Sequence, residues 1–206
     1  MHKTKPTYTF PNLQAKYRAA SISHTIWQAD ITEIKLTHGK VYIFLAIDIQ
    51  TNLIIAHTLS HITLKAPQIT QALQRALDQR HSPAPVLIHT DQGTQFTSKE
   101  YHEFIQLNAG KVIGSMSSAA ARSNQVIERF NRTFKSHRIK GISLPETLEI
   151  GLDPTTLTQK YVDSLNNTPN SKTNGLPPIQ LDSLNNTPNS KTNGLPPIQC
   201  HKKHTA

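Results

Sequence analysis

Three acidic residues, Asp30, Asp91 and Glu128, stand in sequence surroundings that could give a carboxylate a chemical role. Asp30 lies inside the apolar, β-branched run TIWQADITEIKL at residues 25–36, where an unpaired charge is costly to bury. Asp91 follows the short apolar run PVLIHT and precedes a turn, a common position for site residues. Glu128 is the only acid within residues 111–140, a stretch that holds seven Lys or Arg residues.

Together these acids have the oxygen ligands that hard divalent cations such as Mg²⁺ prefer. Two such ions about 3.5–4 Å apart can activate an attacking oxygen and stabilise a leaving one in phosphoryl displacement. Simpler interpretations are open for each residue alone. Asp30 would face water on an edge strand, with Glu33 as its substitute in the site, Asp91 would belong to an ordinary turn, and Glu128 would pair with Arg132.

The hydrophobic pattern predicts the elements that would position these acids. Apolar and β-branched runs predict five strands, at residues 25–36, 41–49, 53–59, 85–91 and 111–115. Helical spacing of apolar residues predicts helices that start at Pro67 and that span 97–108 and 123–138. Three strands joined by short turns, followed by strands alternating with helices, indicate the α/β class with a mixed five-stranded sheet flanked by helices.

The helix predicted at residues 123–138 has two distinct faces. Its apolar stripe consists of Ile127, Phe130 and Phe134. A neighbouring polar face follows from steps of three, four and seven residues, and it carries Asn124, Glu128, Asn131, Arg132 and Lys135. Such a face would bring a carboxylate next to cations that can contact phosphates.

The overall charge favours a polyanionic partner. The 206 residues include 22 Lys and Arg against 13 Asp and Glu, a net charge of +9, which is typical of proteins that bind nucleic acid or an anionic membrane surface. No apolar stretch approaches the ~20 residues of a membrane span, so we expect no membrane partner. Cys200 is the only cysteine, which favours a reducing, cytoplasmic setting.

Composition also predicts how the chain is divided. Residues 1–24 form a basic lead-in without a clear period, and residues 25–142 form the core. Residues 143–180 are expected to hold a C-terminal helix and an Asn- and Pro-rich segment. The segment DSLNNTPNSKTNGLPPIQ occurs at 163–180 and again at 182–199, so residues 181–206 are interpreted as a duplicated, disordered tail.

Three blocks of sequence, in this order, resemble a known family. WQADITEI, HTDQGTQFTSKEY and SNQVIERFNRTFK are similar to the catalytic core of insertion-sequence transposases and retroviral integrases, the DDE family with a ribonuclease H-like fold. The resemblance covers about residues 11–180. It implies metal-dependent phosphodiester hydrolysis and strand transfer in DNA integration or transposition.

The resemblance also implies roles for individual residues. Asp30, Asp91 and Glu128 match the catalytic carboxylates, which in the family hold two Mg²⁺ or Mn²⁺ ions. Lys135 matches a basic residue that contacts DNA, and the same helix is expected to contact DNA through Asn124, Arg129 and Arg132. The implied partners are DNA (element ends and target), further copies of this chain and an upstream helix-turn-helix polypeptide, in a cytoplasmic, nucleoid-associated setting.

Some features depart from the family pattern. Ser123 and Asn124 stand where Asp-Asn is common, and 36 residues separate Asp91 from Glu128, one more than is typical. The usual upstream helix-turn-helix is not in this sequence. Two further hypotheses therefore stay open: a truncated, inactive remnant that only binds nucleic acid, and a ribonuclease H-like nuclease without strand transfer.

Overall fold

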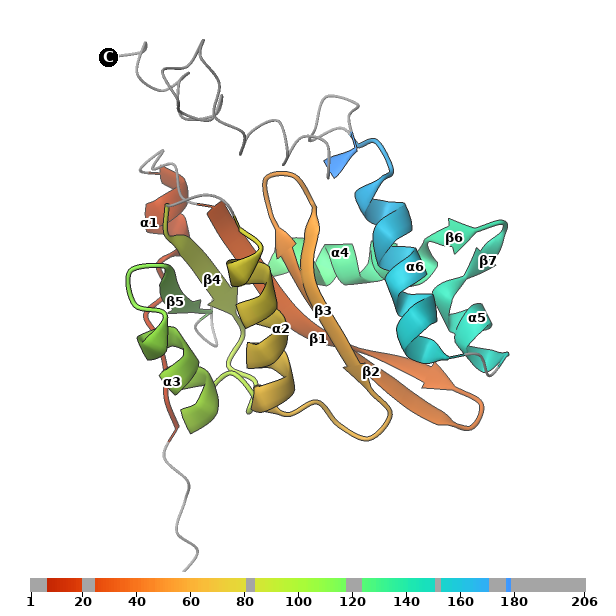
Figure 1. The fold of residues 1–206 in the computed structure, drawn as a ribbon, viewed down its shortest axis with the longest axis horizontal. Helices are drawn as coiled ribbons and strands as arrows, with labels where there is room; N and C mark the ends of the chain where they lie inside the picture. The colour runs from red at the N-terminus through yellow and green to blue at the C-terminus, as the bar shows by residue number, and fades with distance from the viewer. Residues whose placement is uncertain are drawn as a thin grey trace, which may run out of the picture.

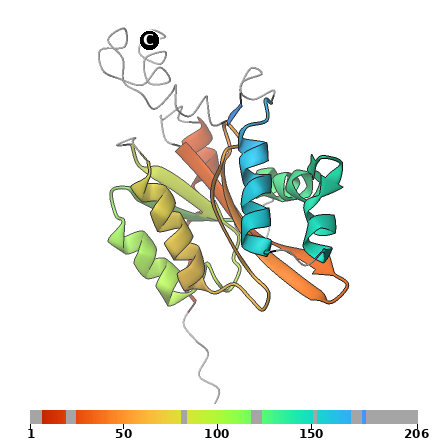
Figure 2. The same ribbon diagram turned by 45° about the vertical axis from the view of Figure 1, so that its right-hand side comes forward.

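A five-stranded mixed sheet with helices on both faces forms the centre of the molecule (Figures 1 and 2). The computed structural model describes residues 7–19, 25–80, 84–117, 124–150, 153–170 and 177–178. The strands are β1 (Thr25–Leu36), β2 (Gly39–Asp48), β3 (Ile54–Ser60), β4 (Val86–Thr90) and β5 (Val112–Met116). Their order is β3-β2-β1-β4-β5, so β1 is the central strand.

The connections between strands explain why the sheet is mixed. Short turns join β1, β2 and β3 into an antiparallel meander, while β4 pairs with β1 and with β5 in parallel. The chain reaches β4 and β5 through helices, as parallel neighbours require. Six consecutive buried residues end β2, because helices cover both faces of the sheet there. The predicted mixed five-stranded sheet is confirmed.

Two hydrophobic layers cover the two faces of the sheet. Helices α2 (Ala66–Asp78) and α3 (Lys99–Leu107) pack on one face, together with Trp27 and Ala29 of β1. Helices α4 (Gln125–Ser136), α5 (Leu144–Glu149) and α6 (Pro154–Asn166) pack on the other, together with Ile34 of β1. Since successive strand residues alternate in direction, Asp30 shares the face of Ile34, which is the face that α4 covers.

Several short elements were not predicted. The lead-in contains α1 (Gln14–Ala19), and a small hairpin of β6 (Arg138–Ile139) and β7 (Ile142–Ser143) follows α4. Helix α5 comes next, before the C-terminal helix α6 that was expected. Elements of two to six residues are too short to show a period. The duplicated segment at 181–206 lies outside the described residues. Within the described residues, no helix combines the length and apolarity needed to cross a bilayer.

Asn166 joins the end of α6 to the edge strand β3. Its Oδ1 accepts from Ile54 N–H at 2.8 Å and its Nδ2 donates to Ile54 O at 3.0 Å, and both residues are buried. We expect Asn166→Ala to lower the free energy of unfolding by about 2 kcal/mol, because two buried backbone groups lose their partner. Urea denaturation measures this loss. Asn167→Ala, at an exposed neighbour, is the matched control and is expected to change it little; equal losses would contradict this role.

Candidate active site

Asp30 and Asp91 lie side by side on neighbouring parallel strands. The register of β1 and β4 runs from Thr25 opposite Val86 to Gln28 opposite His89. Two residues further, the same register places Asp30 level with Asp91, which directly follows β4. Adjacent strands are about 4.8 Å apart, and residues level in register point to the same face. Both carboxylates therefore belong to the face that α4 covers.

Helix α4 runs along β1 and brings Glu128 to the same place. It packs against β1 and β2. Three hydrogen bonds with four-residue spacing mark its path: Ile127 N–H to Gln28 Oε1 (2.9 Å), Asn131 Nδ2 to Asp30 Oδ2 (2.8 Å) and Lys135 Nζ to Glu33 O (3.5 Å). Four helical residues rise about 6 Å, close to the roughly 6.6 Å of two strand residues. From Gln28 to Asp30 the helix and the strand therefore stay in step, and the long Lys135 side chain reaches one residue further, to Glu33 O. Glu128 lies in the first turn of this helix.

The charges of Asp91 and Glu128 both act on Asp30. The pKa of Asp30 is raised from 3.8 to about 6, chiefly by burial and in part by the negative charges of Asp91 and Glu128. Hydrogen bonds from Ile31 N–H (2.8 Å) and from Asn131 oppose the rise. Among the described residues, no ion pair neutralises any of the three acids. Residues that are 37 or more positions apart thus converge into one anionic site.

The carboxylates are near one another without forming a closed ligand shell. Among the described residues, no three His, Cys, Asp or Glu side chains are grouped closely enough to hold one metal ion. Asp91 Oδ1 accepts from Gly93 N–H at 2.9 Å, so the turn after β4 fixes this carboxylate. The Glu128 side chain is exposed on α4, so it can change rotamer without disturbing the core.

The donors at the site suit a hard cation. All three acids offer oxygen ligands, which Mg²⁺ and Mn²⁺ prefer. The buried amide oxygens Asn124 Oδ1 and Asn131 Oδ1 have no hydrogen-bond partner, although buried polar atoms ordinarily have one. A divalent cation with its water ligands would neutralise the acids and would supply donors to such oxygens. The residues present therefore fit a divalent metal.

Two polar residues that support the site were not identified from the sequence. Asn131 was predicted only as part of the polar face of its helix, whereas it is 5% exposed and binds Asp30. Gln28 is fully buried and accepts a hydrogen bond from the first turn of α4, whose N-cap residue Asn124 makes no side-chain cap. A glutamine two residues before Asp30 in an apolar strand was the available signal for this role.

The residues expected to contact DNA fall into two groups. Arg129 and Arg132 are exposed on α4, as a phosphate contact requires. Lys135 is half-buried beside Glu33 O, and Asn124 is buried with its Nδ2 3.5 Å from Ala29 O. Asn124 is therefore placed to hold α4 against β1, and a role of these four residues in binding DNA stays a prediction.

Comparison with known proteins finds one matching family model. Residues 20–113 match the family described as the integrase core domain. The match spans a little under half of the chain. The matched residues include Asp30 and Asp91, whereas Glu128 lies beyond the matched region and is assigned to the site from its position on α4.

The chain is also similar to bacterial transposases. It is 25% identical over 162 residues to the transposase for insertion sequence element IS904 of Lactococcus lactis, covering 77% of this chain and 60% of the relative. It is 33% identical over 116 residues to transposase InsF for insertion sequence IS3A of Escherichia coli, covering 56% and 39%. The chain thus spans less than two thirds of the length of either relative.

The fold is shared with solved integrase cores. The catalytic core domain of HTLV-2 integrase, solved in complex with magnesium in a dimeric form, is similar with a TM-score of 0.58 at 21% sequence identity. The likeness covers 77% of this chain and 96% of the viral one. The expected ribonuclease H-like fold is confirmed.

Proposed function

We propose that this chain is the integrase-like catalytic part of a DNA transposase. As a polynucleotidyl transferase, it would hydrolyse a phosphodiester at the ends of a mobile element and join the freed end to target DNA. The observation that carries the proposal is the register of β1 and β4, which sets Asp30 level with Asp91, together with Glu128 on α4, near enough for its charge to act on Asp30. The match of residues 20–113 to the integrase core domain supports it.

Asp30, Asp91 and Glu128 would hold two Mg²⁺ or Mn²⁺ ions. When bound, such ions supply the positive charge that activates an attacking oxygen and stabilises the leaving one. The oxygen donors of the site and the magnesium in the HTLV-2 integrase core support this choice of metal.

Other residues of the chain would position the acids and the DNA. Asn131 holds the Asp30 carboxylate through its Nδ2, and Gly93 N–H holds that of Asp91. The exposed Arg129 and Arg132 would neutralise DNA phosphates, with Lys135 beside them on α4. Since such contacts are mainly to the DNA backbone, binding should weaken steeply as salt increases.

The proposal includes the setting in which the chain works. Cleavage and joining at both ends of a mobile element would require more than one active site, so we expect a homo-oligomer. The dimeric form of the HTLV-2 integrase core supports this expectation. A helix-turn-helix polypeptide would recognise the element ends. Action on chromosomal DNA would take place in the cytoplasm at the nucleoid.

Metal-dependent joining of DNA tests the proposed function. The substrate is a duplex carrying the boundary of the genomic element, and a supercoiled plasmid serves as target. In Mg²⁺ or Mn²⁺ we expect nicking at the boundary followed by joining to the plasmid, with neither in EDTA. DNA binding without turnover would instead support an inactive remnant. Cleavage of an RNA–DNA hybrid without joining would support a ribonuclease H-like nuclease.

Asn131 offers a more specific test of how the site is positioned. We expect Asn131→Ala to weaken the apparent affinity for Mn²⁺ by about 10-fold, because outer hydrogen bonds orient metal-binding carboxylates. Rates of nicking measured over a series of Mn²⁺ concentrations give this affinity. Thr133→Ala, on the exposed side of the same helix, is the control. An unchanged Mn²⁺ dependence in Asn131→Ala would refute a positioning role.

A further inference from the structure

The small hairpin after α4 has a turn that is unusual for its sequence. Lys140 and Gly141 connect β6 to β7, with φ of 51° and 83°. Two consecutive positive φ values between antiparallel strands indicate a type I′ turn, which favours Asn or Asp before Gly. Lysine is disfavoured in this left-handed conformation because its Cβ lies close to the backbone. Such a conformation persists only where the surrounding structure imposes it.

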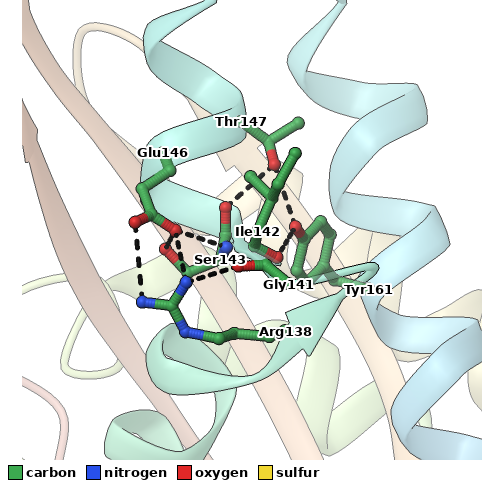
Figure 3. A network of polar contacts seen from close by, with 7 residues as sticks. All are labelled: Arg138, Gly141, Ile142, Ser143, Glu146, Thr147 and Tyr161. Carbon is green, nitrogen blue, oxygen red and sulfur yellow. Dashed lines mark hydrogen bonds and ion pairs between the residues drawn. The ribbon is translucent and has the colours of Figure 1, made fainter.

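Neighbouring side chains hold the hairpin in place (Figure 3). Two-residue strands are too short to be stable alone. Polar contacts with neighbouring residues stabilise the hairpin. Arg138 donates to Gly141 O and to the Glu146 carboxylate, which also accepts from Ser143 N–H. Thr147 Oγ1 donates to Ser143 O, and Tyr161 Oη donates to Ile142 O. Tyr161 is itself 3% exposed on α6, so the hairpin is anchored to the core.

These contacts leave one cation available at the tip. Arg138 forms an ion pair with Glu146 at 3.1 Å and also donates to the turn, so its charge is already matched. Lys140 is exposed and forms no ion pair among the described residues. The hairpin therefore holds an unmatched lysine at a fixed point on the surface.

The position of the hairpin relates Lys140 to the proposed DNA surface. Figure 1 shows β6 and β7 beyond the C-terminal end of α4, away from the turn that carries Glu128. From Glu128 to Ser136 the helix rises about 12 Å, a span of three to four nucleotides of a strand at roughly 3.4 Å each. Arg129 and Arg132 are exposed along this span. Lys140 thus extends a basic surface that leads away from the acids.

We propose that Lys140 contacts a backbone phosphate of DNA bound along α4, a few nucleotides from the reacting phosphodiester. The proposal rests on the proposed function and adds a DNA-positioning residue to it. A fixed turn favours the contact because little conformational freedom is lost when DNA binds. Lysine occupies a backbone conformation that asparagine adopts more easily, and such a locally unfavourable residue is expected where its side chain serves binding.

Charge removal at Lys140 tests the proposal directly. The full chain is titrated with a fluorescent duplex over a series of NaCl concentrations in Lys140→Gln, Lys140→Arg and Lys140→Asn. Loss of one phosphate contact should reduce the slope of log affinity against log salt by about 1 and weaken binding several-fold on any sequence. We expect this loss in Lys140→Gln and Lys140→Asn, and near wild-type binding in Lys140→Arg.

Two comparisons separate binding from folding and from net charge. Lys140→Asn should melt at or above the wild-type temperature, since Asn suits the turn, so its weaker binding would not reflect unfolding. Lys111→Gln removes the same charge at a different place. Lys111 precedes β5, whereas Asp91 follows the neighbouring parallel strand β4, so the two residues lie at opposite ends of these strands, and the substitution should leave the slope unchanged. Equal slopes in Lys140→Gln and Lys111→Gln would overturn the proposal for Lys140 alone. A wild-type chain that neither binds nor nicks DNA would overturn the proposed function as well.

Discussion

Asp91→Asn should abolish metal-dependent nicking and joining of DNA while the chain stays folded. We expect a fall in rate of at least about 10³-fold, equivalent to about 4 kcal/mol of lost transition-state stabilisation, because a neutral amide replaces the charged carboxylate that we propose as a metal ligand. The fold should tolerate the change, because the Asn oxygen can still accept from Gly93 N–H at the turn after β4. Single-turnover nicking in Mg²⁺ measures the rate, and circular dichroism confirms the fold.

Asp78→Asn is the matched control for this result. Asp78 is exposed at the end of α2, on the face of the sheet opposite α4, and the substitution removes the same charge. Its rate should equal that of the wild-type chain. Undiminished nicking by Asp91→Asn would show that this carboxylate does not take part in catalysis.

The second large effect concerns stability and has the opposite sign. Without metal, Asp30→Asn should be more stable than the wild-type chain at pH 8 by about 2 to 3 kcal/mol, because the pKa of Asp30 is about 6 in the folded chain against 3.8 ordinarily. The folded state binds this proton more tightly than the unfolded state. Deprotonation of Asp30 therefore destabilises the folded wild-type chain, and its free energy of unfolding falls as the pH rises from about 4 to 6. Asp30→Asn has no carboxyl group at this position to deprotonate, so it lacks this loss.

The surroundings of Asp30 can accept the amide. Asn131 Oδ1 is buried without a partner, so a flip of the Asn131 amide would let it accept from the new side chain. Urea denaturation in EDTA at pH 4, 6 and 8 measures the difference between the two chains, which should be near zero at pH 4. Mg²⁺ at pH 8 should stabilise only the wild-type chain. A difference that does not vary with pH would contradict the raised pKa of Asp30.

The strands that position Asp30 and Asp91 could be predicted from the sequence for specific reasons. The apolar run that holds Asp30 is long and rich in β-branched residues, and strand β1 spans 25–36 as predicted. Asp91 comes directly after a five-residue buried strand, so its place at the strand end followed from the pattern. Parallel pairing of these two strands then brings the acids together, since register is shared along the whole ladder.

The contacts that refine the site could not be predicted, because they depend on packing between distant segments. Asn131 resembles any polar residue of an amphipathic helix until α4 is placed along β1. The contacts of the lead-in could not be predicted either. Phe10 packs on Gly114, where an added Cβ would lie 2.8 Å from the ring. Pro11 O also accepts from Met116 N–H at 3.4 Å. No local period indicates such contacts between residues about 100 positions apart.

Anomalous diffraction from crystals of the wild-type chain soaked in Mn²⁺ tests the shared metal site most directly. We expect a Mn²⁺ peak between Asp30 and Asp91, with oxygens of both at about 2.0–2.4 Å, and Glu128 turned toward it. Mn²⁺ found only elsewhere on the surface, with the carboxylates of Asp30 and Asp91 unligated, would contradict the assignment of these acids as a metal-dependent catalytic centre.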